Sequence, residues 1–184
     1  MQIVVIGAGQ MGLGIVEVFK RVSIPCKVFD VNPKAVERAR SLGVQAEVFN
    51  PEVTLGNTEL IIEAIAENFQ LKAKLWQSIA SQITENMLVA SNTSSISITW
   101  LASQVPYPEK FLGIHFMNPA PKISLVEIIP GMQTSVDTLG QAQKLMSQIG
   151  QEPIIVQDHP GFVVNKILIP MINEAISLLD NRTA

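Results

Sequence analysis

The chain opens with a strand, a glycine-rich turn and a helix, and this opening constrains the fold more than any other feature. The run IVVIGAGQMGLGI places Gly7, Gly9 and Gly12 in the pattern G-x-G-x-x-G, directly after a short apolar run and at the start of a helix-like segment. The glycine pattern alone is weak, but this context is the one in which it binds a dinucleotide. A strand that leads into a helix in this way predicts a βαβ unit and a parallel sheet.

Each glycine of this loop has its own expected task. Gly7 permits a tight turn, Gly9 lets the backbone approach a pyrophosphate, and Gly12 lets the helix pack closely on the strand. The N-terminus of the helix then presents free N–H groups and a positive dipole end to the anion. Gln10 and Met11 lie inside the loop, so we predict that they also contact the cofactor.

An acidic residue selects which dinucleotide binds. Asp30 follows Gly12 by 18 residues, at the end of the second expected strand. A carboxylate there accepts hydrogen bonds from ribose hydroxyls and repels a 2′-phosphate, which favours NAD over NADP. The alternative, a glycine-rich turn with a surface aspartate, is disfavoured because the strand, the glycines, the helix and the acid stand in register.

Short apolar runs alternate with helix-like segments along the chain. The expected strands are residues 3–6, 26–31, 46–49, 59–66, 87–92, 111–117, 124–129 and 153–158. The expected helices are residues 11–22, 33–42, 69–83, 96–105, 135–149 and 161–180. This order predicts a doubly wound, Rossmann-type α/β fold, with a mostly parallel sheet covered by helices on both faces. The link between 111–117 and 124–129 is too short for a helical crossover, so that pair is expected to be antiparallel.

Composition excludes several classes of protein. The 184 residues suit one domain, or one domain and part of another, and 47% hydrophobic content supports a buried core. The net charge of −3 provides no basic footprint for nucleic acid. Cys26 is the only cysteine, and we expect it to act as a small hydrophobe in a reducing compartment. No apolar run reaches membrane-spanning length, no targeting segment is visible and no metal-ligand spacing appears, so a cytoplasmic location without membrane contact is expected.

Polar residues follow the expected strands at the edge where such sheets bind ligands, outside the carboxyl ends. The fourth strand leads into AIAEN, the fifth into SNTSS and the sixth into IHFMNP. The polar side chains expected at this edge include Glu67, Lys72, Asn92, Ser94, His115 and Asn118. We predict that they surround the nicotinamide end of the cofactor.

Two titratable groups stand in apolar runs 12 positions apart, His115 in GIHFM and Glu127 in SLVEII. If their strands pair antiparallel, the two side chains approach each other. The carboxylate then fixes the imidazole tautomer and stabilises the imidazolium, while the other ring nitrogen exchanges a proton. A buried histidine satisfied by the backbone is the alternative, and the nearby dinucleotide loop and polar edge favour the catalytic interpretation.

Five motifs carry a resemblance to a known family. GAGQMGLGI, EAIAEN, SNTSSISIT, GIHFMNPAPKISLVEII and PGFVVNKILIPMINEAI resemble the L-3-hydroxyacyl-CoA dehydrogenases, including the 3-hydroxybutyryl-CoA enzymes. The resemblance spans nearly the whole chain, and the joint order of the motifs is far more specific than the glycine loop alone.

The resemblance implies NAD-dependent oxidation of an L-3-hydroxyacyl thioester to the 3-oxo form, as in fatty acid metabolism. His115 matches the catalytic acid/base and Glu127 its partner. Ser94 and Asn165 match the active-site serine and asparagine, which hydrogen-bond the substrate oxygens.

Further matches concern binding. Glu67 and Lys72 match residues that contact NAD, and Asn118 matches a position near the acyl-CoA substrate. Asn92, within the SNTSS motif, is also assigned to the cofactor site.

The chain departs from the family pattern in two places. The family inserts a helical pair after the second strand that helps to hold CoA, and residues 31–58 have no room for it. The family also continues into an all-helical second domain that mediates dimerisation. We therefore expect an NAD-binding domain over residues 1–160, followed by residues 161–184 as the first helix of that all-α domain. This helix is apolar around most of its surface, so we expect burial, either in a homodimer or in a domain missing from a truncated chain.

Alternative functions follow from these departures. Without the helical pair, the substrate could be a smaller 3-hydroxy acid not joined to CoA, as in the related gulonate dehydrogenases. A β-hydroxyisobutyrate-type enzyme shares the glycine loop, but the SNTSS motif and the His–Glu pattern speak against it. A non-catalytic NAD-binding module, or an inactive fragment, explains the missing half but not the complete polar edge.

Overall fold

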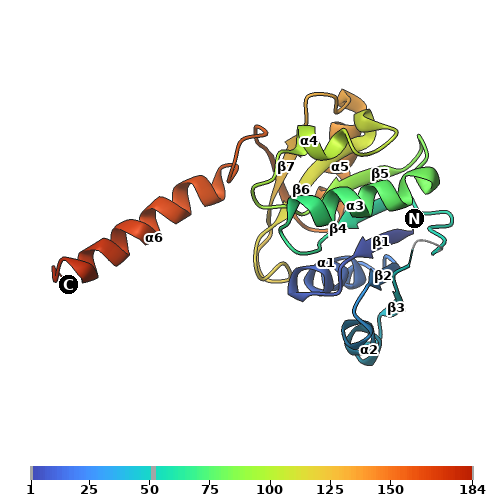
Figure 1. Cartoon of the computed structure of the whole chain (residues 1–184), viewed down its shortest axis with the longest axis horizontal. Coiled ribbons are helices and arrows are strands. Elements are labelled where there is room, and N and C mark those ends of the chain that lie inside the picture. Colours follow the sequence, from blue (N-terminus) through green and yellow to red (C-terminus); the bar gives the residue numbers. More distant parts are fainter. Residues whose placement is uncertain (1, 51–52, 184) are drawn as a thin grey trace.

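One sheet organises the chain (Figure 1). The computed structural model describes residues 2–50 and 53–183. The strands in these residues are β1 (Ile3–Ile6), β2 (Cys26–Asp30), β3 (Gln45–Val48), β4 (Leu60–Glu63), β5 (Leu88–Ser91), β6 (Phe111–Phe116), β7 (Leu125–Pro130) and β8 (Glu152–Ile155). They lie in the order β3-β2-β1-β4-β5-β6-β7-β8. The reversal of strand order beside β1 is the place where doubly wound sheets bind dinucleotides.

The direction of the strands changes once across this sheet. All pairs from β3 to β6 are parallel. β7 runs antiparallel to β6, which confirms the prediction from the short connection, and β8 then pairs parallel with β7. In the antiparallel ladder His115 stands directly opposite Glu127.

Helices cover both faces of the sheet, as the strand–helix alternation predicts. The helices α1 (Gln10–Arg21), α2 (Pro33–Ser41) and α5 (Val136–Gln148) pack on one face, where they share a buried apolar cluster with Ile3 and Val5 of β1. On the other face, α3 (Phe69–Ile79) and α4 (Ile98–Ala102) share a second buried cluster with Val4 and Ile6. Two short 3₁₀ turns, η1 (Ala80–Gln82) and η2 (Pro108–Lys110), complete the connections. Burial on both faces explains why the central strands are continuously apolar.

Some elements are shorter than their sequence patterns predict. The apolar run 59–66 forms a strand only over Leu60–Glu63. The chain leaves the sheet there because the N–H of Ile65 donates to the carboxylate of Glu63, at 2.8 Å, rather than to a neighbouring strand. Similarly, α4 begins at Ile98 because the Ser97 side chain caps it by accepting from the N–H of Trp100.

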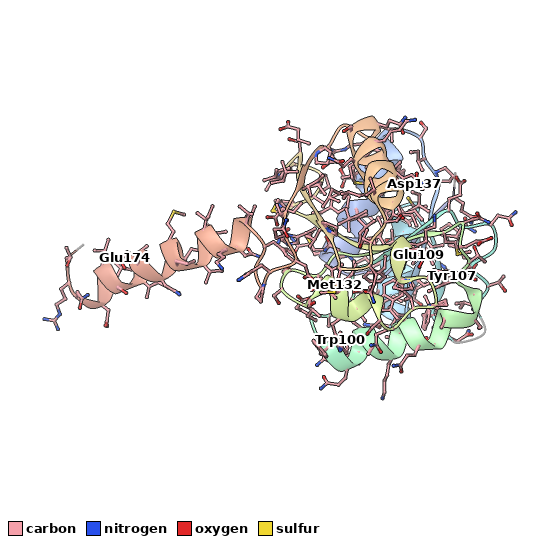
Figure 2. All side chains as sticks on the ribbon, turned by 90° about the horizontal axis from the view of Figure 1, so that it is seen from above. Trp100, Tyr107, Glu109, Met132, Asp137 and Glu174 are labelled. Carbon is pink, nitrogen blue, oxygen red and sulfur yellow. The ribbon has the colours of Figure 1, made fainter. Side chains whose placement is uncertain are left out.

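The sixth helix, α6 (Val164–Asp180), extends away from the sheet (Figure 1). Figure 2 shows Glu174 on this helix, well apart from the other labelled side chains. Ile167 is 65% exposed and Met171 60%, so the expected burial of this apolar helix is not met within the described chain. The domain boundary at residue 160 and the homodimer contact remain predictions. In the described residues no helix has the length and apolar character needed to cross a membrane.

The lone cysteine is inert in this fold. Cys26 begins β2 and lies partly buried against the core beneath α1 and α2. Burial raises the pKa of its thiol to about 12. The reactive thiolate is therefore scarce at neutral pH, which agrees with the interpretation of Cys26 as a small hydrophobe.

Asp158 connects the segment after β8 to α4. Its carboxylate accepts from the N–H groups of Ile98 and Thr99, at 2.9 and 2.8 Å, and from the hydroxyl of Ser97 at 3.0 Å. Burial alone would raise the pKa of this carboxyl, but the hydrogen bonds outweigh burial and leave the pKa below its ordinary value. The ionised side chain therefore holds the start of α4 in place.

We expect the substitution Asp158→Asn to lower the free energy of unfolding by about 1 kcal/mol at pH 6, because an amide has one acceptor oxygen and no charge where the carboxylate accepts three charge-assisted hydrogen bonds. A carboxyl whose pKa is lowered by folding contributes stability above its unfolded pKa of about 3.9 and loses it as the pH falls through the folded value. The difference between the two proteins should therefore shrink between pH 6 and pH 3 in urea unfolding. Asp137→Asn, at an exposed site in α5, is the control, and a gap independent of pH would contradict this account.

Candidate active site

The glycine loop has room for no side chain at two of its positions. Gly7 has φ +114°, and a Cβ atom there would lie 2.4 Å from the carbonyl oxygen of Ala64. A Cβ at Gly12 would lie 1.8 Å from the carbonyl oxygen of Gly7. A Cβ at Gly9, by contrast, would face open space. The loop is therefore closed against the sheet on one side and open to a ligand at Gly9.

The N-terminus of α1 faces that open space. Gly9 is its N-cap, and no side chain caps the first turn. The N–H groups of this turn are therefore available to an anion, and the helix dipole adds to the attraction.

Asp30 lies at the end of β2 beside this loop. Its Oδ2 accepts from the N–H of Ala8 at 2.7 Å, and its Oδ1 accepts from the N–H of Asn32 at 2.8 Å. Each oxygen keeps a second lone pair for a ribose hydroxyl. Asp30 and Gly9 line a cavity of about 600 Å³ that continues along α3 to Lys74. The closed loop, the uncapped helix and the acid together fit NAD.

The neighbouring predicted residues have contacts within the protein. The side-chain amide of Gln10 donates to Oδ1 of Asn118 at 3.1 Å, which joins the glycine loop to the segment after β6. Asn92 accepts from the N–H of Phe116 at 2.9 Å. Met11 packs against the core beneath α1. Their direct contacts with the cofactor or substrate remain predictions.

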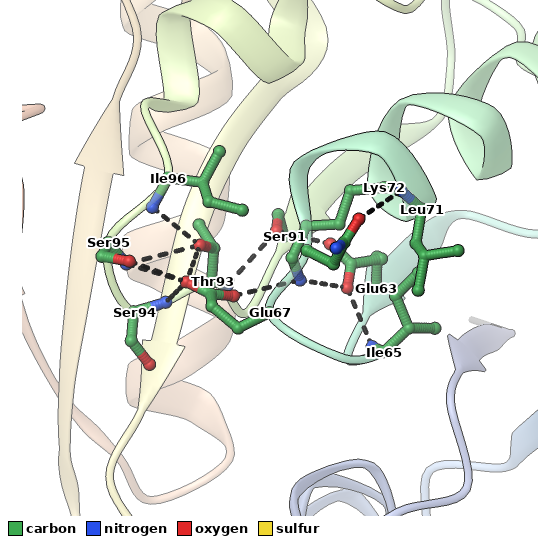
Figure 3. Close-up of polar contacts among 11 residues, drawn as sticks. Glu63, Ile65, Glu67, Leu71, Lys72, Ser91, Thr93, Ser94, Ser95 and Ile96 are labelled. Carbon is green, nitrogen blue, oxygen red and sulfur yellow. Dashed lines mark hydrogen bonds and ion pairs between the residues drawn. The ribbon is translucent and has the colours of Figure 1, made fainter.

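A buried ion pair lies behind the polar edge (Figure 3). Nζ of Lys72 lies 2.6 Å from Oε1 of Glu63, and the two side chains are 1% and 0% exposed. Oε2 of Glu63 accepts from the hydroxyl of Ser91 at 2.6 Å. Sequence analysis missed Glu63, although a carboxylate inside the apolar run ELIIEAIA was a signal for it. The ammonium group of Lys72 is buried and paired with Glu63. Its predicted contact with NAD therefore remains a prediction, and this buried position gives it no support.

Glu67 shapes the loop that carries Ser94. Its Oε1 accepts from the hydroxyl of Thr93 at 2.6 Å, from the N–H groups of Ser94 and Ser95 at 2.9 and 3.0 Å, and from the Ser95 hydroxyl at 3.1 Å (Figure 3). Its Oε2 lies 3.4 Å from Nζ of Lys72. Burial alone would raise the pKa of this carboxyl, but these donors and the lysine charge outweigh burial, so its pKa lies below the ordinary value. The carboxylate of Glu67 thus fixes the conformation of the loop that carries Ser94.

His115 and Glu127 meet across the antiparallel ladder. Nδ1 of His115 lies 2.7 Å from Oε2 of Glu127, and the residues are 5% and 0% exposed. Oε1 of Glu127 accepts from the N–H groups of Val163 and Val164, each at 2.9 Å. Among the described residues no hydrogen bond involves Nε2 of His115. The geometry therefore orients the imidazole and leaves one ring nitrogen for a ligand.

Ser94 and Asn165 line one cavity, of about 440 Å³, together with Gly161 and Pro170. Asn165 directly follows the two N–H groups that bind Glu127, so the same contact positions the start of α6. The structure thus brings together two pairs of predicted site residues: His115 with Glu127, and Ser94 with Asn165. The catalytic roles of these residues remain proposals.

Fold and site together define a Rossmann-type NAD-binding domain with a polar active-site edge. The model of the NAD binding domain of 3-hydroxyacyl-CoA dehydrogenases matches residues 2–50 and 50–159. The chain belongs to this family, and NAD is its cofactor.

Relatives extend this comparison. The chain is 37% identical to a probable 3-hydroxybutyryl-CoA dehydrogenase of Bacillus subtilis, over 95% of this chain and 69% of that protein. The structure of (S)-3-hydroxybutyryl-CoA dehydrogenase from Ralstonia eutropha is similar with a TM-score of 0.89 and 37% identity, over 100% of this chain and 72% of that one. An NAD⁺-dependent dehydrogenase of 5-formyl-3-hydroxy-2-methylpyridine 4-carboxylic acid is similar with a TM-score of 0.92 and 32% identity, over 100% and 66%.

The matches cover only part of each relative. It spans about two thirds of the length of these relatives. The alignment with the Bacillus subtilis protein covers 198 positions, which exceeds the 184 residues of the chain. The relative therefore carries residues inside the matched region that are missing here, in keeping with the expected absence of an insertion.

We expect Lys72→Met to lower the free energy of unfolding by about 3–5 kcal/mol, because it leaves Glu63 charged and unpaired in the interior. The double variant Glu63→Gln/Lys72→Met removes both charges and should recover most of that loss. Urea unfolding of the two variants measures the difference, and Lys74→Met, at the cavity beside Asp30, is the matched control in α3. A double variant no more stable than Lys72→Met would contradict the ion-pair interpretation.

Proposed function

We propose that this chain supplies the NAD-binding and catalytic part of an enzyme that oxidises an L-3-hydroxyacyl-CoA to the 3-oxoacyl-CoA. The observation that carries the proposal is the buried contact of 2.7 Å between His115 and Glu127 at the edge that also holds the glycine loop. The glycine loop and Asp30 would hold NAD, which would supply the acceptor for the hydride on C3 of the substrate. The remaining chemistry is the transfer of one proton and the stabilisation of charge on oxygen.

His115 is the proposed acid/base. With Glu127 ionised, Nδ1 carries a proton toward the carboxylate, so Nε2 accepts the proton of the C3 hydroxyl. The positive charge that develops on the ring is stabilised by Glu127, which the N–H groups of Val163 and Val164 hold in position. Low exposure of both residues strengthens this attraction, because water does not screen it.

Ser94 and Asn165 are the proposed hydrogen-bonding groups for the substrate oxygens. Both line the same cavity, and the loop that carries Ser94 is held by Glu67. Dipoles oriented in advance stabilise the charge that forms on oxygen during oxidation. One such group is typically worth about 3 kcal/mol in the transition state.

A second candidate is oxidation of a hydroxyl substrate that is not joined to CoA. One of the similar structures is named for a pyridine carboxylic acid, and this chain lacks the helical pair expected to hold CoA. A non-catalytic NAD module is less well supported, because it does not explain the oriented imidazole. Homodimerisation through α6, a role in fatty acid metabolism and a cytoplasmic location belong to the leading proposal.

NADH formation tests these candidates directly. We expect absorbance at the NADH wavelength to rise with 3-hydroxybutyryl-CoA and not with free 3-hydroxybutyrate or gulonate. Turnover of a free acid would favour the second candidate instead. NAD binding by titration, without turnover of any of the three, would contradict the proposed activity of this chain.

For the acid/base role, we expect His115→Gln to reduce kcat by about 10²–10⁴, because glutamine cannot accept the hydroxyl proton. The Kd for NAD should stay unchanged, since the glycine loop and Asp30 are untouched. His159→Gln, which changes the only other histidine, is the control and should leave kcat intact. Loss of NAD affinity alongside activity would undermine the assignment of His115.

A further inference from the structure

A buried ion pair lies behind the loop that carries Ser94. Nζ of Lys72, on α3, and Oε1 of Glu63, at the end of β4, are 2.6 Å apart, and both side chains are buried. Taking two charges out of water is costly, and an apolar pair of similar volume is often at least as stable. Stability of the fold alone therefore does not account for an ion pair at this place.

The ion pair reaches beyond the interior. Nζ of Lys72 also lies 3.4 Å from Oε2 of Glu67, whose side chain is 39% exposed. Two carboxylates thus share one ammonium group, and one of them stands at the active-site edge (Figure 3). Because Glu63 holds the ammonium from the inside, Lys72 is fixed beside Glu67 and cannot turn toward solvent without leaving a buried charge unpaired.

Glu67 passes this contact on to the serine loop. Its Oε1 accepts from the hydroxyl of Thr93 at 2.6 Å and from the N–H groups of Ser94 and Ser95 at 2.9 and 3.0 Å. Among the described residues, Lys72 is the only partner of the other oxygen, Oε2. The loop therefore depends on one carboxylate oxygen, and the orientation of that carboxylate depends on Lys72.

A second route leads from the ion pair to the same loop. Oε2 of Glu63 accepts from the hydroxyl of Ser91 at 2.6 Å, and Oγ of Ser91 accepts from the N–H of Thr93 at 3.2 Å. Thr93 directly precedes Ser94 in the chain. Both routes thus begin at Glu63 and end at the loop that carries Ser94.

We propose that Glu63 and Lys72 are positioning residues for Ser94: they fix Glu67, and Glu67 holds Ser94 where it meets the substrate oxygen. The inference rests on the proposed function, which assigns that hydrogen bond to Ser94. Lys72 then serves the reaction from inside the protein, without touching NAD. A displacement of about 1 Å at a reacting group can cost a factor of about 10² in rate, so weaker support of this loop has a measurable effect.

The double variant Glu63→Gln/Lys72→Met tests this role, because it removes both charges and nearly preserves the volume of the pair. The new amide oxygen can still accept from Ser91, so the variant interrupts the route through Glu67. Glu47→Gln/Lys27→Met is the matched control: Lys27 and Glu47 form an ion pair at 2.9 Å between β2 and β3, away from the serine loop. Urea unfolding identifies conditions in which both variants are folded, and all comparisons are made there.

NADH formation from 3-hydroxybutyryl-CoA is the first measurement. We expect the double variant to lower kcat about tenfold with KM nearly unchanged, because the hydrogen bond from Ser94 strengthens in the transition state. The Kd for NAD should not change, and the control should match the unmodified chain in all three quantities. An unchanged kcat in the folded double variant would overturn the inference. A raised Kd for NAD as the only effect would assign Lys72 to the cofactor instead and would also overturn it.

The substitution Ser94→Ala distinguishes positioning from a general effect on the site. If the ion pair acts through Ser94, adding Glu63→Gln/Lys72→Met to Ser94→Ala should lower kcat by less than about twofold further, because the two changes affect one interaction. The same factor of loss with and without Ser94 would show that the pair acts elsewhere, and would contradict the proposal.

Amide hydrogen exchange tests the contact without turnover. The N–H groups of Ser94 and Ser95, which Glu67 binds, should exchange at least about tenfold faster in the double variant. Those of Val163 and Val164, which Glu127 binds, should be unaffected and serve as the internal reference. Unchanged exchange at the two serines would refute the positioning role. If the unmodified chain oxidises no thioester, the proposed function fails, and hydrogen exchange still decides whether the ion pair holds the loop.

Discussion

The carboxylate of Glu127 joins three parts of the molecule that are far apart in sequence. One oxygen binds His115 on β6, and the other accepts two N–H groups at the start of α6. A buried carboxylate is costly unless its oxygens accept hydrogen bonds. The partners of Glu127 are His115 itself and the two N–H groups directly before Asn165. The orientation of the imidazole, the course of the chain after β8 and the placement of Asn165 therefore depend on one side chain.

A parallel arrangement holds the other half of the site. Glu63 and Glu67 share Lys72, and Glu67 gathers the donors of the loop that carries Ser94. Without a common acceptor, the serine and threonine hydroxyls of this loop could bond to neighbouring backbone groups and favour other turn conformations. Several charge-assisted hydrogen bonds to Glu67 hold this loop, and they position Ser94 at its cavity. The active-site edge is thus built from two carboxylate centres, one beside the imidazole and one beneath the serine loop.

Two cavities of opposite character lie on the two faces of the sheet. The one beside Asp30 combines an acid with the open glycine loop, whereas the one between α1, α2 and the loop after β6 is lined by four cationic side chains and one carboxylate. Both contact the N-terminal end of α1, at Gly9 and Gln10 respectively.

Sequence alone determined the order of the elements, the covered parallel sheet, the antiparallel pair and the dinucleotide loop, because apolar periodicity, glycine spacing and connection length are local properties of the chain. It also indicated that His115 and Glu127 could meet, since a short link between two strands restricts their register. Only the tertiary structure decided that Lys72 is paired inside the protein with Glu63, that Glu127 binds the start of α6, and that cations of α1, α2 and the loop at Lys122 line one groove. These outcomes depend on distances between segments 9 to more than 80 residues apart in the chain, which side-chain packing sets and no local pattern encodes.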